Sequence, residues 1–399
     1  MTIQTKTVHP GLVLLALALG GFAIGTTEFA SMSLLPYFAK DLGVDAPTAG
    51  HAISAYAMGV VVGAPVIAVA AARLPRRVIL TLLMAVFAVG NLLSALAPDF
   101  GWMIAFRFFS GLPHGAYFGV AALVAASVSP PEKRAQSVAM VMIGLTVATI
   151  VGVPMANVVG QWIGWRWGFV IVSVLASLTA LSVWLYAPRV PADAKASPLR
   201  ELSALGKGRV WLTLGIGAIG FGGLFCVYTY LADTLLAVTH ASPAALPVVL
   251  AVFGAGMTVG TLVCAWAADR ALMPAIGAIL LWSAGALALY PLAVGNLWTL
   301  LPVVFLIGCG GGLGSALQTR LMDVAGEAQT LAAALNHSAF NTANALGPWL
   351  GGLAIAAGYG WASTGWVGVA LAMGGFVIWI VAALDARQQQ QRLMLAAAE

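Results

Sequence analysis

The chain has 399 residues, of which 61% are hydrophobic and 8% charged, and its mean hydropathy is +0.98. Because soluble domains carry about 25% charged residues, this composition excludes a soluble domain and predicts a protein embedded in a lipid bilayer. The net charge of +5 does not indicate nucleic-acid binding, because the basic residues lie in short segments between apolar runs.

Twelve apolar runs are each long enough to cross the hydrocarbon core as a helix, which takes about 20 residues. They cover residues 11–38, 48–72, 77–97, 100–127, 135–160, 166–187, 210–238, 244–268, 273–293, 298–322, 329–357 and 362–384. Turn signals such as Pro98-Asp99 separate them. We therefore expect an all-α membrane protein with twelve transmembrane helices.

The lysines and arginines indicate which side of the membrane each run begins on. If the N-terminus is cytoplasmic, that side holds all but three of the 18 basic residues. The exceptions are Lys40, Arg166 and Arg107, the last of which lies within a run. We expect a multi-pass protein of the bacterial cytoplasmic (inner) membrane with both termini in the cytoplasm.

The longest polar stretch divides the runs six from six, and the two halves resemble each other. Arg73 follows the second run as Arg270 follows the eighth, and glycine and proline recur in the fifth and eleventh runs. Tandem six-helix repeats are one architecture for alternating access around a site near the bilayer midplane. The expected parts are an N-terminal six-helix bundle (1–187), a cytoplasmic linker (188–209), a C-terminal six-helix bundle (210–386) and a cytoplasmic tail (387–399).

Cofactor and enzyme motifs are absent from the sequence. Cys226, Cys264 and Cys309 all fall in apolar runs, with no Cys-x-x-Cys pair, so neither a disulfide framework nor a metal site is predicted. A phosphate-binding Gly-x-x-x-x-Gly-Lys-Ser/Thr loop is also missing, which argues against ATP coupling. We expect no cofactor and no enzymatic activity.

Glu28 is the only acidic or basic side chain in the first run, and an acid in hydrocarbon indicates a functional site. The alternative is an acid that only solvates a water-filled cavity. Arg107 and His114 lie seven residues apart on one helix face, and Glu28 falls between them in depth. We expect these three residues to couple to protons, although His114 alternatively packs as a hydrogen-bonded histidine. Asp233 is interpreted as solvated near the outer interface, with a second proton site as the alternative.

His337, Asn341 and Asn344 form a polar stripe on one face of the eleventh run. These groups would be unsatisfied in lipid, so they must face protein or water. One interpretation is a substrate-binding surface of donors and acceptors, and the other is hydrogen bonding between helices. Gln318 in the tenth run allows the same two interpretations.

Several short motifs carry a family resemblance. They are Thr27-Glu28-Phe29, Pro113-His114-Gly115 and Asn336-His337-Ser338, together with a basic loop after the second run and the arginine of the fourth. On these grounds the chain resembles the major facilitator superfamily. Within it, the chain is similar to the twelve-span drug:proton antiporters, and in particular to the arabinose-efflux-permease and sugar-efflux branch.

The resemblance implies a monomer with a central cavity, in which Thr27, Phe29, Tyr56 and Tyr117 would join the stripe of the eleventh run in contacting substrate. It also implies gating residues in the basic loops and the glycine–proline motifs. These are Arg73, Arg76, Arg77, Asp269, Arg270, Gly152, Pro154, Gly347 and Pro348. The alternative for the arginines is that they only set the topology. In the resembling antiporters the glycine–proline motif of the fifth run is associated with export, whereas the more complete copy here is in the eleventh.

The expected function is export of small organic solutes, drugs or sugars, by proton antiport with alternating access. The expected partners are therefore a small-molecule substrate, protons and the lipid bilayer, without nucleic acid. One alternative is a proton symporter or uniporter that imports a sugar or metabolite. A transporter-like sensor is the alternative from a different class.

Overall fold

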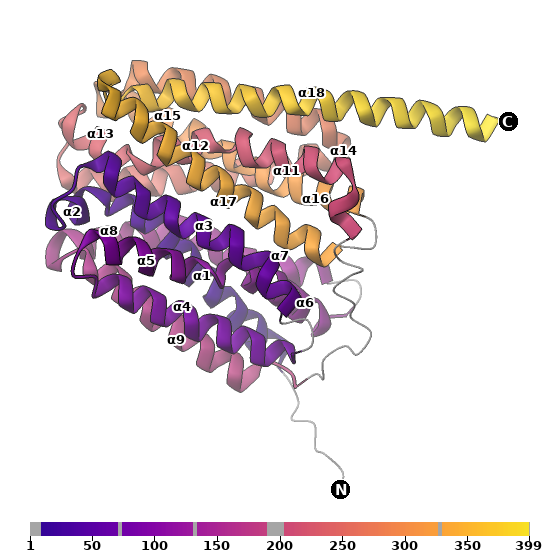
Figure 1. The fold of residues 1–399 in the computed structure, drawn as a ribbon, viewed down its shortest axis with the longest axis horizontal. Helices are drawn as coiled ribbons and strands as arrows, with labels where there is room; N and C mark the ends of the chain where they lie inside the picture. The colour runs from indigo at the N-terminus through magenta and orange to yellow at the C-terminus, as the bar shows by residue number, and fades with distance from the viewer. Residues whose placement is uncertain (1–8, 71–73, 131–133, 190–202, 326–328, 399) are drawn as a thin grey trace, which may run out of the picture.

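The structure is a computed structural model that describes residues 9–70, 74–130, 134–189, 203–325 and 329–398, and all regular elements within these ranges are helical. The helices lie side by side in one bundle (Figure 1). This architecture confirms the all-α fold class. We refer to the helices before and after the predicted linker as the first and second helix groups.

The first helix group occupies the chain up to Tyr186. Its elements are α1 (Pro10–Ser33), α2 (Leu35–Asp41), α3 (Ala46–Ala70), α4 (Arg76–Ala95), α5 (Phe100–Gly111), α6 (His114–Ser127), α7 (Arg134–Val147), the π-helix η2 (Ala148–Gly152), α8 (Val153–Ile163) and α9 (Arg166–Tyr186).

The second helix group follows the described part of the linker. Its elements are η3 (Ser203–Gly206), α11 (Gly208–Gly220), α12 (Gly222–Thr229), α13 (Leu231–Ala237), η4 (Pro243–Ala245), α14 (Leu246–Ala293), α15 (Leu297–Cys309), η5 (Gly310–Gly312), α16 (Leu313–Ala325), α17 (Gln329–Ala354), the π-helix η6 (Ile355–Tyr359) and α18 (Ser363–Ala398).

Several predicted runs are interrupted rather than continuous. The fourth breaks between α5 and α6 at Leu112 and Pro113, and the fifth contains η2 directly before Pro154. Proline removes a backbone donor and clashes with the preceding turn, which accounts for both interruptions. The first run also breaks at Leu34, so that the short helix α2 continues α1 at one end of the bundle.

Ten stretches of the described residues are long and apolar enough to cross a membrane. One of them, Pro243–Ala293, contains two predicted runs, and the backbone leaves the helical region at Ala271 between them (φ −156°, ψ 83°). The polar helix α17 is not among the ten. The protein therefore crosses the membrane many times, and twelve spans remain a prediction.

The two ends of the bundle are distinct in Figure 1. Helices α2 and α13 lie at one end, called here the α2 end, and α6 and α16 lie at the other, called the α16 end. Helix α18 continues to Ala398 and projects beyond the α16 end, so residues 387–398 of the predicted tail are helical.

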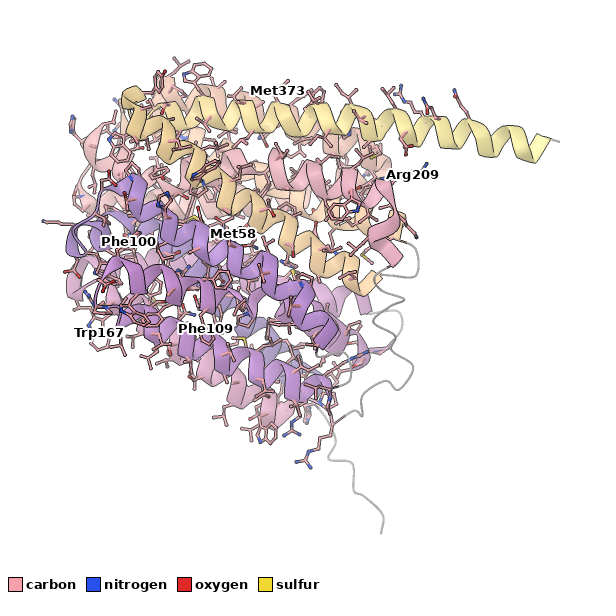
Figure 2. The ribbon with its side chains drawn as sticks, viewed as in Figure 1. Met58, Phe100, Phe109, Trp167, Arg209 and Met373 are labelled. Atoms are coloured by element: carbon pink, nitrogen blue, oxygen red, sulfur yellow. The ribbon has the colours of Figure 1, made fainter. Side chains whose placement is uncertain are left out.

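The sides of the bundle carry large apolar side chains, such as Met58, Trp167 and Met373 (Figure 2). These side chains are 45%, 50% and 38% exposed, which would be unfavourable in water and suits contact with lipid. Inside, one apolar cluster lies wholly in the first helix group and another in the second, whereas the largest includes residues of both. The helix groups meet mainly where α17 packs along α3 and where α14 packs on η2 and α8.

Gly347 shows how closely the helices approach. A Cβ atom at this position of α17 would lie 2.3 Å from the carbonyl oxygen of Gly222 and 2.9 Å from the amide nitrogen of Cys226, both in α12. Backbone atoms cannot rotate away as a side chain can. Glycine is therefore required here for packing, which is how small residues act in membrane helices.

Replacing Gly347 by alanine is expected to lower the unfolding temperature of the purified protein in detergent, followed by tryptophan fluorescence. Gly285→Ala in α14 is the control, because no atom lies within 4 Å of its added Cβ. Alanine forms helix better than glycine, so this control should be unchanged or slightly more stable. Equal unfolding temperatures for the two variants would contradict the packing argument.

Asp41 ties three segments together at the α2 end. Its carboxylate accepts hydrogen bonds from the Arg166 guanidinium and from Trp165 Nε1, the latter at 3.0 Å, and Arg166 also donates to the carbonyl oxygen of Ala97. The Arg166 and Trp165 hydrogen bonds lower the pKa of Asp41. The interaction therefore stabilises the fold above the ordinary carboxyl pKa of about 3.9, and the stabilisation is lost as the pH falls through the lower folded-state value.

Asp41→Asn is accordingly expected to lower the unfolding temperature slightly at pH 7. Exposed ion pairs contribute only about 0–1 kcal/mol, so the effect should be small. At pH 3 the difference between wild type and variant should shrink, because the Asp41 carboxyl of the unfolded chain, with its ordinary pKa of about 3.9, is largely protonated there and folding must release that proton. A difference that stays constant or grows on acidification would show that the ion pair is not responsible.

Candidate functional site

Glu28 lies at the junction of the two helix groups. Its side chain is 7% exposed, and its Oε1 accepts a hydrogen bond of 3.1 Å from Nδ2 of Asn344, which is fully buried in α17. The residues of α1 from Ala23 to Ser33 are all buried, so this part of the helix has no face towards lipid. The acid is thus enclosed by protein, and its one described hydrogen bond reaches into the second helix group.

Arg107 is fully buried in α5, at the level of Glu28. Its two terminal nitrogens donate to the hydroxyls of Thr27 (3.4 Å) and Ser31 (3.2 Å), which lie one residue before and three residues after Glu28 on α1. The guanidinium lies 4.2 Å above the Tyr56 ring and 5.3 Å from the Phe169 ring. Ring faces attract cations, so hydroxyls and aromatic rings together replace part of the lost water. The Nε atom of Arg107 is buried without a hydrogen-bond partner among the described residues.

Thr27 connects this arginine to a residue that the sequence analysis did not identify. Its hydroxyl donates to Oδ1 of Asn91 at 2.6 Å, and Nδ2 of Asn91 donates to the carbonyl oxygen of Phe87 at 2.9 Å. Asn91 is fully buried in α4. The only amide side chain in the third apolar run was the signal that could have identified Asn91.

A second set of contacts involves the histidines His114 and His337. The Tyr56 hydroxyl and His114 Nδ1 are 2.9 Å apart, and either can donate, depending on the histidine tautomer. The His114 and His337 ring centroids are 5.9 Å apart, and His337 stacks on Phe118 at 4.9 Å with an angle of 4° between the planes. These contacts therefore connect α3 and α6 of the first helix group with α17 of the second.

Two amides on α17 have unused acceptors. Asn341 donates from Nδ2 to the carbonyl oxygen of His337 one turn earlier, and Asn344 donates to Glu28. Oδ1 of each amide is buried and has no hydrogen-bond partner among the described residues. An unpaired buried acceptor is costly, so these two oxygens are available to a ligand or to water.

Phe29 extends across the junction into a cluster of aromatic rings. Its ring centroid lies 6.1 Å from that of Phe225 and 5.4 Å from that of Tyr228, both on α12. Phe253 packs on Tyr228 at 4.3 Å. Of these residues the sequence analysis named only Phe29. Phe221, Phe225 and Tyr228 have spacings of four and three residues, and this pattern could have revealed a single aromatic face.

The structure gives different surroundings to two residues that were predicted to contact substrate, Tyr117 and Gln318. The Tyr117 hydroxyl donates to the carbonyl oxygen of Leu17 at 2.8 Å, and its ring fills the space beside Gly20. Tyr117 therefore packs α6 against α1. Gln318 lies on α16, partly buried, and does not belong to the contacts described above.

The basic residues predicted to gate make contacts within their own helix groups, and Arg73 lies outside the described residues. Arg76 donates to the carbonyl oxygen of Leu123 at 3.5 Å. Arg77 lies 4.5 Å from the Trp184 ring. In the second helix group, Arg270 follows Asp269 and lies over the Trp266 ring at 3.8 Å.

The glycine–proline positions lie at helix contacts. A Cβ on Gly152 would be 2.3 Å from Thr26 Oγ1, so η2 packs directly on α1 before Pro154. The carbonyl oxygen of Pro348, next to Gly347, accepts a hydrogen bond of 2.8 Å from the Tyr230 hydroxyl.

A bundle of membrane-crossing helices with a buried acid and free amide oxygens at the junction of two helix groups is an arrangement that suits a membrane transporter. The chain belongs to the major facilitator superfamily: the Major Facilitator Superfamily model matches residues 17–233. This confirms the family resemblance that the sequence motifs indicated.

Individual comparisons agree with this family. The chain is 38% identical over 384 residues to the "Inner membrane transport protein YdhP" of Escherichia coli (strain K12), covering 96% of this chain and 98% of that protein. It is 35% identical over 348 residues to a "Chloramphenicol resistance protein" of Streptomyces lividans, covering 84% and 87%. The crystal structure of the nucleoside transporter NupG shares the fold, with a TM-score of 0.72 at 13% identity over 93% of this chain and 99% of that one.

Thr27→Val tests the role of the Thr27 hydroxyl in holding the buried arginine. The change keeps the shape but leaves Asn91 Oδ1 and one arginine nitrogen without a partner, which should cost about 1–3 kcal/mol of unfolding free energy. The matched control is Thr261→Val on α14, whose exposed hydroxyl bonds only to the carbonyl oxygen of Met257 in its own helix. Thermal unfolding of both proteins in detergent measures the effect, and equal loss in both would argue against a special role for Thr27.

Proposed function

We propose that this protein exports small organic solutes across a bacterial inner membrane in exchange for protons, by alternating access between two six-helix halves. The carrying observation is the Glu28–Asn344 hydrogen bond, which joins the helix groups at a buried acid. The halves are residues 1–187 and 210–386, linked by 188–209, and the protein works as a monomer. Its α2 end faces outwards, an orientation that the distribution of basic residues supports.

Glu28 is the proton carrier in this proposal. Burial disfavours its charged form, whereas the guanidinium of Arg107 one helix away favours it, so small changes at the junction decide whether the proton stays. A substrate that bonds to Asn344 and Asn341 perturbs the amide that now contacts Glu28. Substrate and proton therefore compete for one junction, and competition produces antiport.

The proposed substrates are flat, partly apolar molecules that carry polar groups. The rings of Phe29, Phe225 and Tyr228 offer an aromatic surface beside the amide oxygens of α17. The similarity to a chloramphenicol resistance protein supports an aromatic drug, and the inner-membrane location of the YdhP relative supports the cellular location. Sugars remain the second substrate class, because amides and imidazole also suit hydroxyl groups.

Purified protein in liposomes with a lumenal pH dye tests the antiport. Amphenicols, sugars and lipophilic cations are added under an imposed pH gradient, and proton movement is recorded for wild type, Glu28→Gln and the control Asp45→Asn. Asp45 is an exposed acid whose carboxylate accepts from the Thr48 amide. We expect substrate-dependent proton movement, opposite to the substrate, in wild type and in the control.

In Glu28→Gln this coupled movement should fall to background, while exchange of labelled for unlabelled substrate without a gradient should persist. Proton movement in the same direction as the substrate would indicate a symporter. Flux that neither the gradient nor the variant alters would indicate a uniporter. Substrate binding without flux in any condition would favour a sensor.

A further inference from the structure

A second acid, Asp233, lies partly buried at the α2 end, on a different helix from Glu28. Asp233 lies on α13, which packs against α1 and α2 of the first helix group. Its Oδ2 is buried and has no hydrogen-bond partner among the described residues. The proposed exchange at Glu28 does not use this group.

Among the described residues, the groups within electrostatic reach of Asp233 are tyrosines rather than cations. Tyr37 on α2, Tyr230 beside α13 and Tyr290 on α14 are near enough to interact with its charge. The Tyr37 hydroxyl is itself buried without a hydrogen-bond partner in the described structure. An unused donor and an unused acceptor thus lie on opposite sides of the contact between the helix groups.

The charged residues of the neighbouring segments are engaged elsewhere or exposed. Asp41 on α2 is paired with Arg166, and Asp45 accepts from the Thr48 amide. Lys40 is exposed. No cation compensates the Asp233 carboxylate within the described ranges.

An uncompensated carboxylate in this packing is unfavourable, so the closed contact between α13 and α2 favours the neutral acid. Separating α13 from α2 would admit water to Asp233 and allow it to ionise. The acid therefore has different proton affinities in the two arrangements. By linkage, protons must then shift the balance between them.

We propose that Asp233 is a second proton-binding site, and that binding of a proton there holds the α2 end of the bundle closed. This inference rests on the alternating-access part of the proposed function but not on the role of Glu28. Low pH favours the closed α2 end, and high pH favours its opening. With one proton involved, the ratio of open to closed molecules changes by at most about tenfold per pH unit.

Spin labels at the α2 end measure this directly. Lys40→Cys on α2 and Ala237→Cys at the end of α13 are exposed positions on the two helix groups, whereas the native Cys226, Cys264 and Cys309 are buried. The distance distribution between the labels is measured by double electron–electron resonance in nanodiscs from pH 5.5 to 8.5. Substrate is left out, so transport is not required.

As the pH rises, the fraction of molecules with the longer distance between the two labels should increase. The increase should be the same in the labelled protein and in its Glu28→Gln form. In Asp233→Asn it should stay rare at every pH, because the amide is neutral throughout. Asp233→Ser is a second neutral variant in case the amide does not fold. A pH response that persists in a folded neutral variant, or that is missing from the parent protein, overturns the proposal. A response lost in Glu28→Gln but kept in Asp233→Asn also overturns it, and assigns the proton to Glu28.

Discussion

Two ionisable side chains, Glu28 and Arg107, lie among apolar helices with almost no access to solvent, and the contacts around them must compensate for the missing water. The compensation differs between the two. The described partners of Arg107 are hydroxyls and rings on α1, α3 and α9, which all belong to the first helix group. The described hydrogen-bond partner of Glu28 is Asn344, on the second. The arginine is thus fixed within one group, while the environment of the acid changes whenever the groups move relative to each other.

This asymmetry relates the packing to the chemistry of transport. A carboxyl whose partner sits on the other helix group changes its proton affinity when that partner moves or is taken by a ligand. The buried oxygens of Asn341 and Asn344 and the rings around Phe29 lie at the same junction, so a ligand that uses them acts on the acid directly. In the proposed mechanism, proton and solute are coupled because they bind next to each other, without a long path between separate sites.

The all-α fold and the choice of Glu28 as the centre of the candidate site followed from simple sequence signals, whereas the partners of Glu28 and Arg107 did not. Apolar run length revealed the helices, and the lone acid in the first run pointed to the junction. The break at Pro113 was missed because run length is insensitive to kinks. The contacts of Arg107 with Ser31 and of Thr27 with Asn91 depend on which faces of distant helices meet, and one sequence does not contain that information. For the polar stripe on α17, the sequence left open whether it binds substrate or forms hydrogen bonds between helices. Asn344 is compatible with both, because it donates a hydrogen bond to Glu28 across the junction and its Oδ1 has no partner among the described residues.

The central claim is that substrate displaces the proton of Glu28, and the most direct measurement counts protons released on binding. Purified protein in weakly buffered detergent solution is titrated with a solute that the liposomes transport, and the pH change is recorded with a soluble dye. The account predicts release of up to one proton per substrate bound by wild type and none by Glu28→Gln, with binding followed separately by labelled substrate. Equal release by both proteins, or substrate binding to wild type with no release at any pH between 5.5 and 8.5, would contradict it.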